Sequence, residues 1–234
     1  MTRVPGGDAG RGSAGSASPR PIAVILSGAR GSGKTSVCMR LAGVFPRYAG
    51  IVCPGIFDAE AREVGKLALC LPGAESWELA RTDADLGGPR TGRFSFSAPG
   101  IARAVACIRA ALSGAGAPPP SASDSPLAPF PGLCVIDEIG LLELDRAEGF
   151  APILPLLESS GPLIATVRTG LESRIAKLLP RHEIVYVGLD AMDVGEAVRR
   201  IADSLSPTGS GSTPIPRRGC GPAPWRSRGP GPRA

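Results

Sequence analysis

Short apolar runs and helical apolar stripes alternate along residues 21–205. Continuous or nearly continuous apolar runs, which indicate strands, occupy residues 22–26, 133–136 and 163–167, and a further strand is expected at 183–187, where apolar residues follow Glu183. Apolar residues recur at helical spacing after Gly33 and within residues 101–112, 150–157, 171–178 and 194–205. This alternation predicts an α/β fold with a mostly parallel central sheet and helices on both faces.

Two further segments depart from that alternation. Residues 50–53 and 66–71 have the composition of short strands and flank a polar turn at 58–63, which predicts an antiparallel excursion. Residues 115–131 are rich in Pro and Ser and carry no periodicity. We expect a surface loop or disordered insert there, because compact domains rarely contain such a long structureless connection.

The two ends are poor in residues that build a core. Residues 1–20 are rich in Gly, Ser, Ala and Arg, and residues 206–234 are rich in Pro, Gly, Ser and Arg, so we predict disordered tails around one domain at 21–205. The net charge of +5 resides in these ends. The remaining core is mildly acidic and offers no aromatic platform, which argues against specific nucleic-acid binding.

The six cysteines are scattered singly, without a C-x-x-C pair, and the chain has one histidine. This pattern provides no ligand set for structural zinc. Cys107 and Cys134 lie within apolar patterns and are expected to be small buried hydrophobic residues, as suits a reducing compartment. No leader pattern and no apolar run of about 18 residues is visible, so we predict a cytoplasmic protein without membrane association.

The strongest chemical motif follows the first apolar run and precedes a helical segment. It has the spacing G-x-x-x-x-G-K-T, in which glycines let successive backbone N–H groups face phosphate oxygens, and the start of the helix favours negative charge. Lys34 is placed to reach the β- and γ-phosphates, and Thr35 to bind Mg²⁺. The predicted nucleotide-binding residues are Gly28, Ala29, Arg30, Gly31, Ser32, Gly33, Lys34, Thr35 and Ser36.

A second motif ends the apolar run at 133–136 with the acidic pair Asp137 and Glu138. Parallel sheets bind ligands at the carboxyl ends of their strands, so this pair is expected to meet the phosphate loop. Asp137 suits the hydration shell of Mg²⁺, and Glu138 suits a base that orients and deprotonates a water attacking the γ-phosphate. Arg168, at the end of another strand, is either a charge stabiliser or an ordinary surface residue.

These motifs together resemble the small P-loop nucleoside-triphosphatases, a family that includes a thermophile enzyme and a human cancer-related nucleoside-triphosphatase. The resemblance implies Mg²⁺-dependent hydrolysis of nucleoside triphosphates to diphosphates with broad base tolerance, and Glu138 as the catalytic base. Leu141-Leu142 and Ala191-Met192-Asp193 depart from the family's usual Lys-Met and Asn-Arg-Asp, which affects base preference and rate. The likeness rests on residues 28–36, 60–65, 79–81 with 92–94, and 137–140 with 143–144.

Two other functions share the loop and the Mg²⁺ chemistry. A small-molecule or nucleotide kinase would exclude water and close an arginine-bearing lid, whereas Glu138 beside Asp137 favours hydrolysis. A non-catalytic nucleotide switch would pass a loop rearrangement to a protein partner, and the Pro-rich residues 118–131 offer a place for docking. Replacing Glu138 with Gln distinguishes hydrolase from switch, because only the hydrolase depends on that carboxylate.

Overall fold

The computed structural model describes residues 19–73, 75–114 and 132–206 of the chain. The tails predicted at 1–20 and 206–234, apart from residues 19, 20 and 206, and the insert predicted at 115–131 lie outside the described residues. The described part folds around one ten-stranded sheet.

One half of the sheet is parallel, in the strand order β10-β1-β9-β8-β2. Its central strands are apolar runs buried on both faces, as expected for parallel strands covered by helices. All five strands point their carboxyl ends toward the same edge of the sheet. These strands are β1 (Ile22–Ser27), β2 (Tyr48–Val52), β8 (Leu133–Ile139), β9 (Leu163–Val167) and β10 (Glu183–Gly188).

The other half is antiparallel and continues from β2 in the order β4-β5-β7-β6, with β3 paired to β4. The predicted excursion is therefore confirmed, and it is larger than expected. Four of its five strands were not predicted, because they are short, polar or rich in glycine and lack strict alternation. The strands are β3 (Gly55–Phe57), β4 (Glu63–Leu71), β5 (Glu75–Arg81), β6 (Gly87–Thr91) and β7 (Phe94–Ser97).

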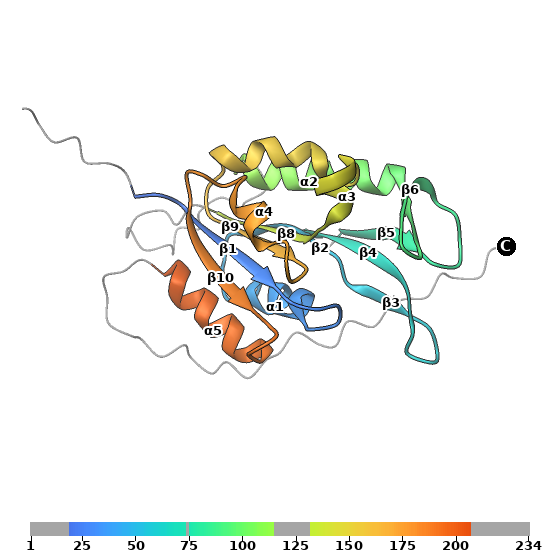
Figure 1. The fold of residues 1–234 in the computed structure, drawn as a ribbon, viewed down its shortest axis with the longest axis horizontal. Coiled ribbons are helices and arrows are strands. Elements are labelled where there is room, and N and C mark those ends of the chain that lie inside the picture. Colours follow the sequence, from blue (N-terminus) through green and yellow to red (C-terminus); the bar gives the residue numbers. More distant parts are fainter. Residues whose placement is uncertain (1–18, 74, 115–131, 207–234) are drawn as a thin grey trace, which may run out of the picture.

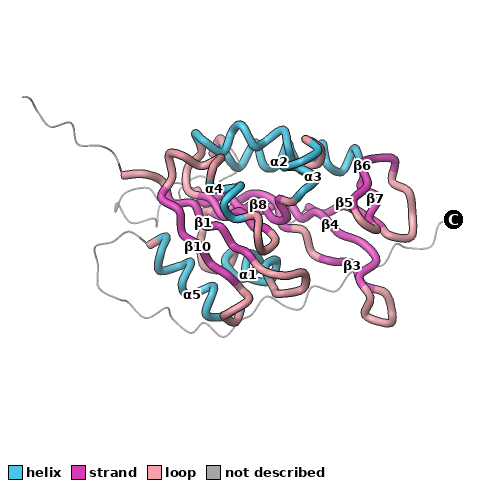
Figure 2. Tube along the Cα trace, viewed as in Figure 1, coloured by secondary structure: helices cyan, strands magenta, loops and turns pink. Residues whose placement is uncertain are grey.

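Helices cover both faces of the sheet, which confirms the predicted α/β fold class (Figure 1; Figure 2). On one face α1 (Lys34–Leu41) and α5 (Val194–Leu205) close one apolar core. The other face carries α2 (Ala98–Leu112), α3 (Leu141–Arg146), η1 (Ala151–Ser159) and α4 (Glu172–Ala176). The helix expected at 150–157 is the 3₁₀ helix η1, which contains Pro155, a residue without the N–H that an α-helix needs. Within the described residues, no helix is both long and apolar enough to cross a membrane.

The cysteines differ from expectation at one position. Cys107 is not a free buried hydrophobic residue, since it forms a disulfide with Cys70 that joins α2 to β4. The two residues are 37 positions apart and meet because α2 packs across the sheet, which local sequence patterns do not reveal. Cys134 is free and buried, as predicted.

Candidate functional site

The phosphate loop joins the carboxyl end of β1 to α1, in the position expected from the motif. Gly33 caps α1 with φ at 98°, a left-handed conformation that L side chains rarely adopt. A Cβ there would also lie 2.7 Å from Cγ2 of Val194. The oxygen Oγ of Ser32 is buried and makes no hydrogen bond within the described part of the chain. A buried hydroxyl without a partner is costly, and a phosphate oxygen at this loop would satisfy it.

The side chain of Lys34 lies across the same loop. Its Nζ donates hydrogen bonds to the carbonyls of Gly28 at 2.6 Å and Ala29 at 2.8 Å. Burial lowers the pKa of Lys34, against the opposing effect of the carboxylates of Asp137 and Glu138. The ammonium group thus stands at the loop and close to the acidic pair.

The two predicted motifs meet at Thr35 and Asp137. Thr35 Oγ1 donates to Asp137 Oδ2 at 2.9 Å. Asp137 is completely buried and also accepts hydrogen bonds from the backbone N–H of Cys53 at 3.0 Å and from Thr166 Oγ1 at 2.6 Å. Three donors, one from α1, one just after β2 and one from β9, therefore fix this carboxylate beside the first turn of α1.

The hydroxyl of Thr35 and the carboxylate of Asp137 fit a magnesium site. Mg²⁺ prefers oxygen ligands and is usually held by one or two protein side chains together with phosphate oxygens and water. Among the described residues there is no group of three or more His, Cys, Asp or Glu side chains able to hold a metal by themselves. This arrangement suits an ion that arrives with a phosphate.

Glu138 has an unusual backbone. Its φ is 71°, and the pairing of β8 with β9 shifts register between Ile136 and Ile139. In a regular strand the side chains of Asp137 and Glu138 would point to opposite faces of the sheet. The irregular pairing at these two residues changes the directions of their side chains. The N–H of Glu138 donates to Thr166 Oγ1 at 2.8 Å. The Thr166 hydroxyl therefore contacts both acidic residues: it donates to the carboxylate of Asp137 and accepts from the backbone N–H of Glu138.

The carboxylate of Glu138 forms an ion pair with Lys66 of β4. About a third of the Glu138 side chain (34%) is exposed to solvent, so a water can reach it. Burial of the rest, and the neighbouring Asp137, raise the pKa of Glu138, while Lys66 opposes that rise. Sequence analysis missed Lys66, because its approach to Glu138 depends on the position of β4 in the sheet.

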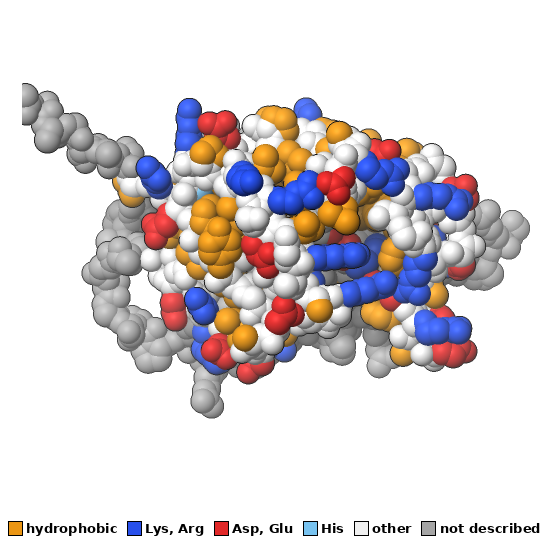
Figure 3. Space-filling model, in the orientation of Figure 1, with side chains coloured by type: hydrophobic (Ala, Val, Ile, Leu, Met, Phe, Trp, Pro, Cys, Tyr) orange, Lys and Arg blue, Asp and Glu red, His pale blue; other side chains and the backbone are white. Residues whose placement is uncertain are grey.

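Arg30 is oriented by contacts outside the loop. Its Nε donates to Glu63 Oε2 at 3.1 Å, and its guanidinium lies 5.4 Å from the ring centroid of Phe94. The guanidinium of Arg93 lies 5.3 Å from the same ring. Basic side chains gather toward the antiparallel half of the molecule on the face drawn in Figure 3. Arg62, just before β4, and Arg90 of β6 belong to this half, and both side chains are exposed.

Arg168 and Arg81 differ in their surroundings. Val167 pairs with Ser27, so Arg168 follows β9 where the phosphate loop begins. Its positive charge contributes to the lowered pKa of Lys34, after the effect of burial. Arg81 pairs instead with Asp83 at 2.6 Å and Glu78 at 3.2 Å. Arg168 thus lies beside the phosphate loop with an exposed side chain, whereas Arg81 is paired with residues of its own strand and turn.

Asp190, in the turn after β10, was also missed by sequence analysis. Its Oδ1 accepts the backbone N–H of Ala29 at 3.2 Å and its Oδ2 accepts the hydroxyl of Thr169 at 2.8 Å. One carboxylate therefore connects the phosphate loop with the segments after β9 and β10. No local motif marks such a residue; only the strand order brings it to the loop.

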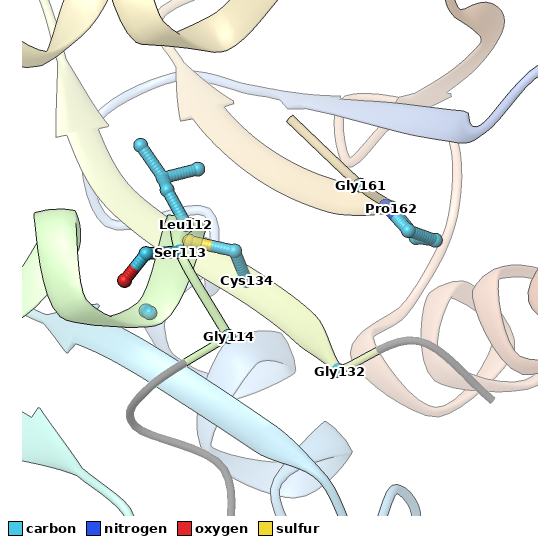
Figure 4. Close-up of a pocket in the computed structure, with 8 residues that line it drawn as sticks. Leu112, Ser113, Gly114, Gly132, Cys134, Gly161 and Pro162 are labelled. Carbon is cyan, nitrogen blue, oxygen red and sulfur yellow. The ribbon is translucent and has the colours of Figure 1, made fainter. Parts of the chain in front are cut away.

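A separate cavity of about 180 Å³ lies at the opposite edge of the sheet, near the starts of β8 and β9 (Figure 4). Its lining includes Leu112, Cys134 and Pro162 and has no charged side chain among the described residues. Burial raises the pKa of the Cys134 thiol to about 12. The cavity therefore lacks the chemistry found at the phosphate loop.

Comparison with known proteins agrees with this geometry. A protein-family model described as NTPase matches residues 23–202. A nucleoside-triphosphatase THEP1 from Methanopyrus kandleri is 29% identical over 128 residues, which span 53% of this chain and 61% of that relative's length. The match thus covers less than two thirds of the relative.

Two solved structures share the fold. A human cancer-related nucleoside triphosphatase superposes with a TM-score of 0.56 at 16% identity, over 81% of this chain and all of the other. THEP1 from the hyperthermophile Aquifex aeolicus gives a TM-score of 0.52 at 14% identity, over 80% of this chain and all of the other. At these identities the likeness concerns the fold.

Proposed function

Because the chain belongs to the NTPase family, we propose that it is a Mg²⁺-dependent enzyme that hydrolyses nucleoside triphosphates, ATP and GTP among them, to diphosphate and phosphate. The observation that carries this proposal is the hydrogen bond between Thr35 and Asp137, with Glu138 as the next residue. That arrangement supplies, at the edge of one phosphate loop, oxygen ligands for a metal and a carboxylate for a water.

In the proposed mechanism the loop binds the phosphates through its backbone N–H groups, and Lys34 exchanges its bonds to loop carbonyls for bonds to the β- and γ-phosphates. Thr35 and Asp137 hold Mg²⁺. The chemistry that Mg²⁺ supplies when bound is neutralisation of charge on the β- and γ-phosphate oxygens. Glu138 orients a water in line with the γ-phosphorus and accepts its proton as the bond to the leaving oxygen breaks.

The test is phosphate release from a panel of nucleoside triphosphates with and without Mg²⁺. We expect turnover that requires the metal and falls sharply in Lys34→Ala and Glu138→Gln, while Glu138→Gln still binds nucleotide. Lys177→Ala and Glu183→Gln are matched controls, because both residues are exposed; Lys177 lies just beyond α4 and Glu183 begins β10. Tight nucleotide binding without phosphate release would overturn the proposal and indicate a kinase or a switch.

The proposed location is the cytoplasm. The observation against it is the Cys70–Cys107 disulfide, since disulfides are rare in reducing compartments. Alkylation of free thiols immediately upon cell lysis, followed by mass spectrometry, tests the point. A reduced Cys70–Cys107 pair agrees with the cytoplasm, and a fully oxidised pair contradicts it.

A further inference from the structure

Lys66 is a largely buried cation that contacts two carboxylates. Its side chain is 14% exposed, and its Nζ pairs with Glu138 and, at 3.0 Å, with Glu63. A buried ammonium is costly unless it is paired and hydrogen-bonded. Burial alone would lower the pKa of Lys66, but the two carboxylates raise it above its usual value, so the side chain is charged.

The position of Lys66 follows from the sheet. It lies on β4, opposite Gly55 of β3, just past the point where β2 ends at Val52. In the strand order, β2 separates β4 from β8, which carries Glu138. The lysine therefore reaches over the end of β2 to the acidic pair, and connects the antiparallel half of the sheet with the parallel half.

Glu63 is in turn fixed from the other side. It pairs with Arg30 of the phosphate loop, and Arg93 Nη2 donates to its backbone carbonyl at 2.6 Å. Although burial works in the opposite direction, hydrogen bonding from Arg30 and the charge of Lys66 lower the pKa of Glu63. Arg30, Glu63, Lys66 and Glu138 thus form a continuous chain of ion pairs from the phosphate loop to the proposed base.

We infer that Lys66 is a positioning residue that holds the carboxylate of Glu138 in the orientation needed to align the attacking water; this inference rests on the proposed function. Within the described residues Lys66 is the cation paired with Glu138, whereas Lys34 is bound to loop carbonyls and Arg30 to Glu63. The Glu138 side chain is one third exposed and lies on a bulged strand, so an ion-pair partner is needed to fix the position of its carboxylate. Position matters because the rate falls steeply when a catalytic group is displaced from its reacting geometry.

The prediction is a loss of turnover that acts through Glu138. We expect Lys66→Met to lower kcat by about 10- to 100-fold, a part of what general-base catalysis contributes, with nucleotide Kd within about threefold. Lys66→Arg restores part of the rate, since it keeps the charge. Glu63→Gln, which removes one charge that holds the lysine, lowers kcat less than Lys66→Met.

The experiment is a double-mutant cycle with Glu138→Gln, measured as single-turnover phosphate release at saturating ATP and Mg²⁺. If Lys66 acts through Glu138, the double variant is as slow as Glu138→Gln alone, within about twofold. Lys177→Met is the matched control, since that lysine is exposed beyond the end of α4. Thermal unfolding of each variant shows whether it is folded. If Lys66→Met does not fold, the same rates are measured for Lys66→Arg and Glu63→Gln.

Three results would overturn the inference. They are an unchanged kcat in Lys66→Met, a double variant slower than Glu138→Gln by the full factor of Lys66→Met, and an effect confined to nucleotide Kd. The second of these would mean that Lys66 acts on the substrate directly. Failure of the proposed function is distinct, because the wild-type chain itself would then bind nucleotide without releasing phosphate.

Discussion

The backbone of Glu138 gives a prediction that separates its conformation from its charge. With φ at 71°, the residue occupies the left-handed region, which costs an L residue with a Cβ about 1–2 kcal/mol. Glycine does not have this cost. Glu138→Ala and Glu138→Gly both remove the carboxylate and the ion pair with Lys66, so the two variants differ only in the Cβ.

The magnitude follows from two opposing terms. Relative to Glu138→Ala, Glu138→Gly avoids the strain of about 1–2 kcal/mol in the folded state. It is destabilised by about 0.4–1 kcal/mol, because its unfolded chain is more flexible. We therefore expect Glu138→Gly to be more stable than Glu138→Ala by about 0.5–1 kcal/mol. For a domain of this size that difference corresponds to about 1–4 °C in Tm.

The assay is urea denaturation of both variants without nucleotide, with equal m-values as a check on the unfolded state. The control is Arg200→Ala against Arg200→Gly, since Arg200 is exposed in the middle of α5. There the order reverses, and alanine is the more stable by about 1 kcal/mol. If Glu138→Ala equals or exceeds Glu138→Gly in stability, the assigned backbone strain is refuted.

Three further predictions concern the metal, the sheet and pH. Thr35→Val, which keeps the side-chain shape and removes the oxygen, is expected to raise the Mg²⁺ concentration needed for half-maximal phosphate release at least tenfold, and an unchanged requirement would count against Thr35 as a ligand. Gly50→Ala places a Cβ 2.1 Å from the carbonyl oxygen of Val135 at a φ of 126°, so we expect a loss of more than about 3 kcal/mol in urea melts; a near-native midpoint would show that the strands are not so close. The pKa of Asp85 is lowered from 3.8 to about 2, first by the N–H of Gly87 and then by the hydroxyl of Ser95, so its contribution to stability is present above pH 3.8 and is lost as the pH falls toward 2. The stability advantage of the wild type over Asp85→Ala is accordingly expected to shrink between pH 4 and pH 2, and a constant difference would argue against the shifted pKa.

Much of the fold and the centre of the site were predictable, because their signals are local. The apolar runs that became β1, β8 and β9 are continuous, and the phosphate loop follows one of them directly. The rule that parallel strands place their carboxyl ends together then predicts the meeting of Thr35 with Asp137, which the structure contains at 2.9 Å.

The remainder depends on contacts between distant segments. Lys66 and Glu138 are 72 positions apart, and they meet only because β2 ends where β4 passes. The disulfide of Cys70 and the strand β6, which contains Gly87, Gly88 and Pro89, likewise result from tertiary packing that overrides weak local preferences. A single sequence has no signal for such pairs.

The central claim is that a water positioned by Glu138 attacks the γ-phosphorus of a nucleoside triphosphate. Hydrolysis in water enriched in ¹⁸O, followed by mass spectrometry of the products, measures this directly. The account predicts that the label enters inorganic phosphate and not the diphosphate, at a rate that falls sharply in Glu138→Gln. Label in the diphosphate, or transfer of the phosphoryl group to another acceptor without labelled phosphate, would contradict it.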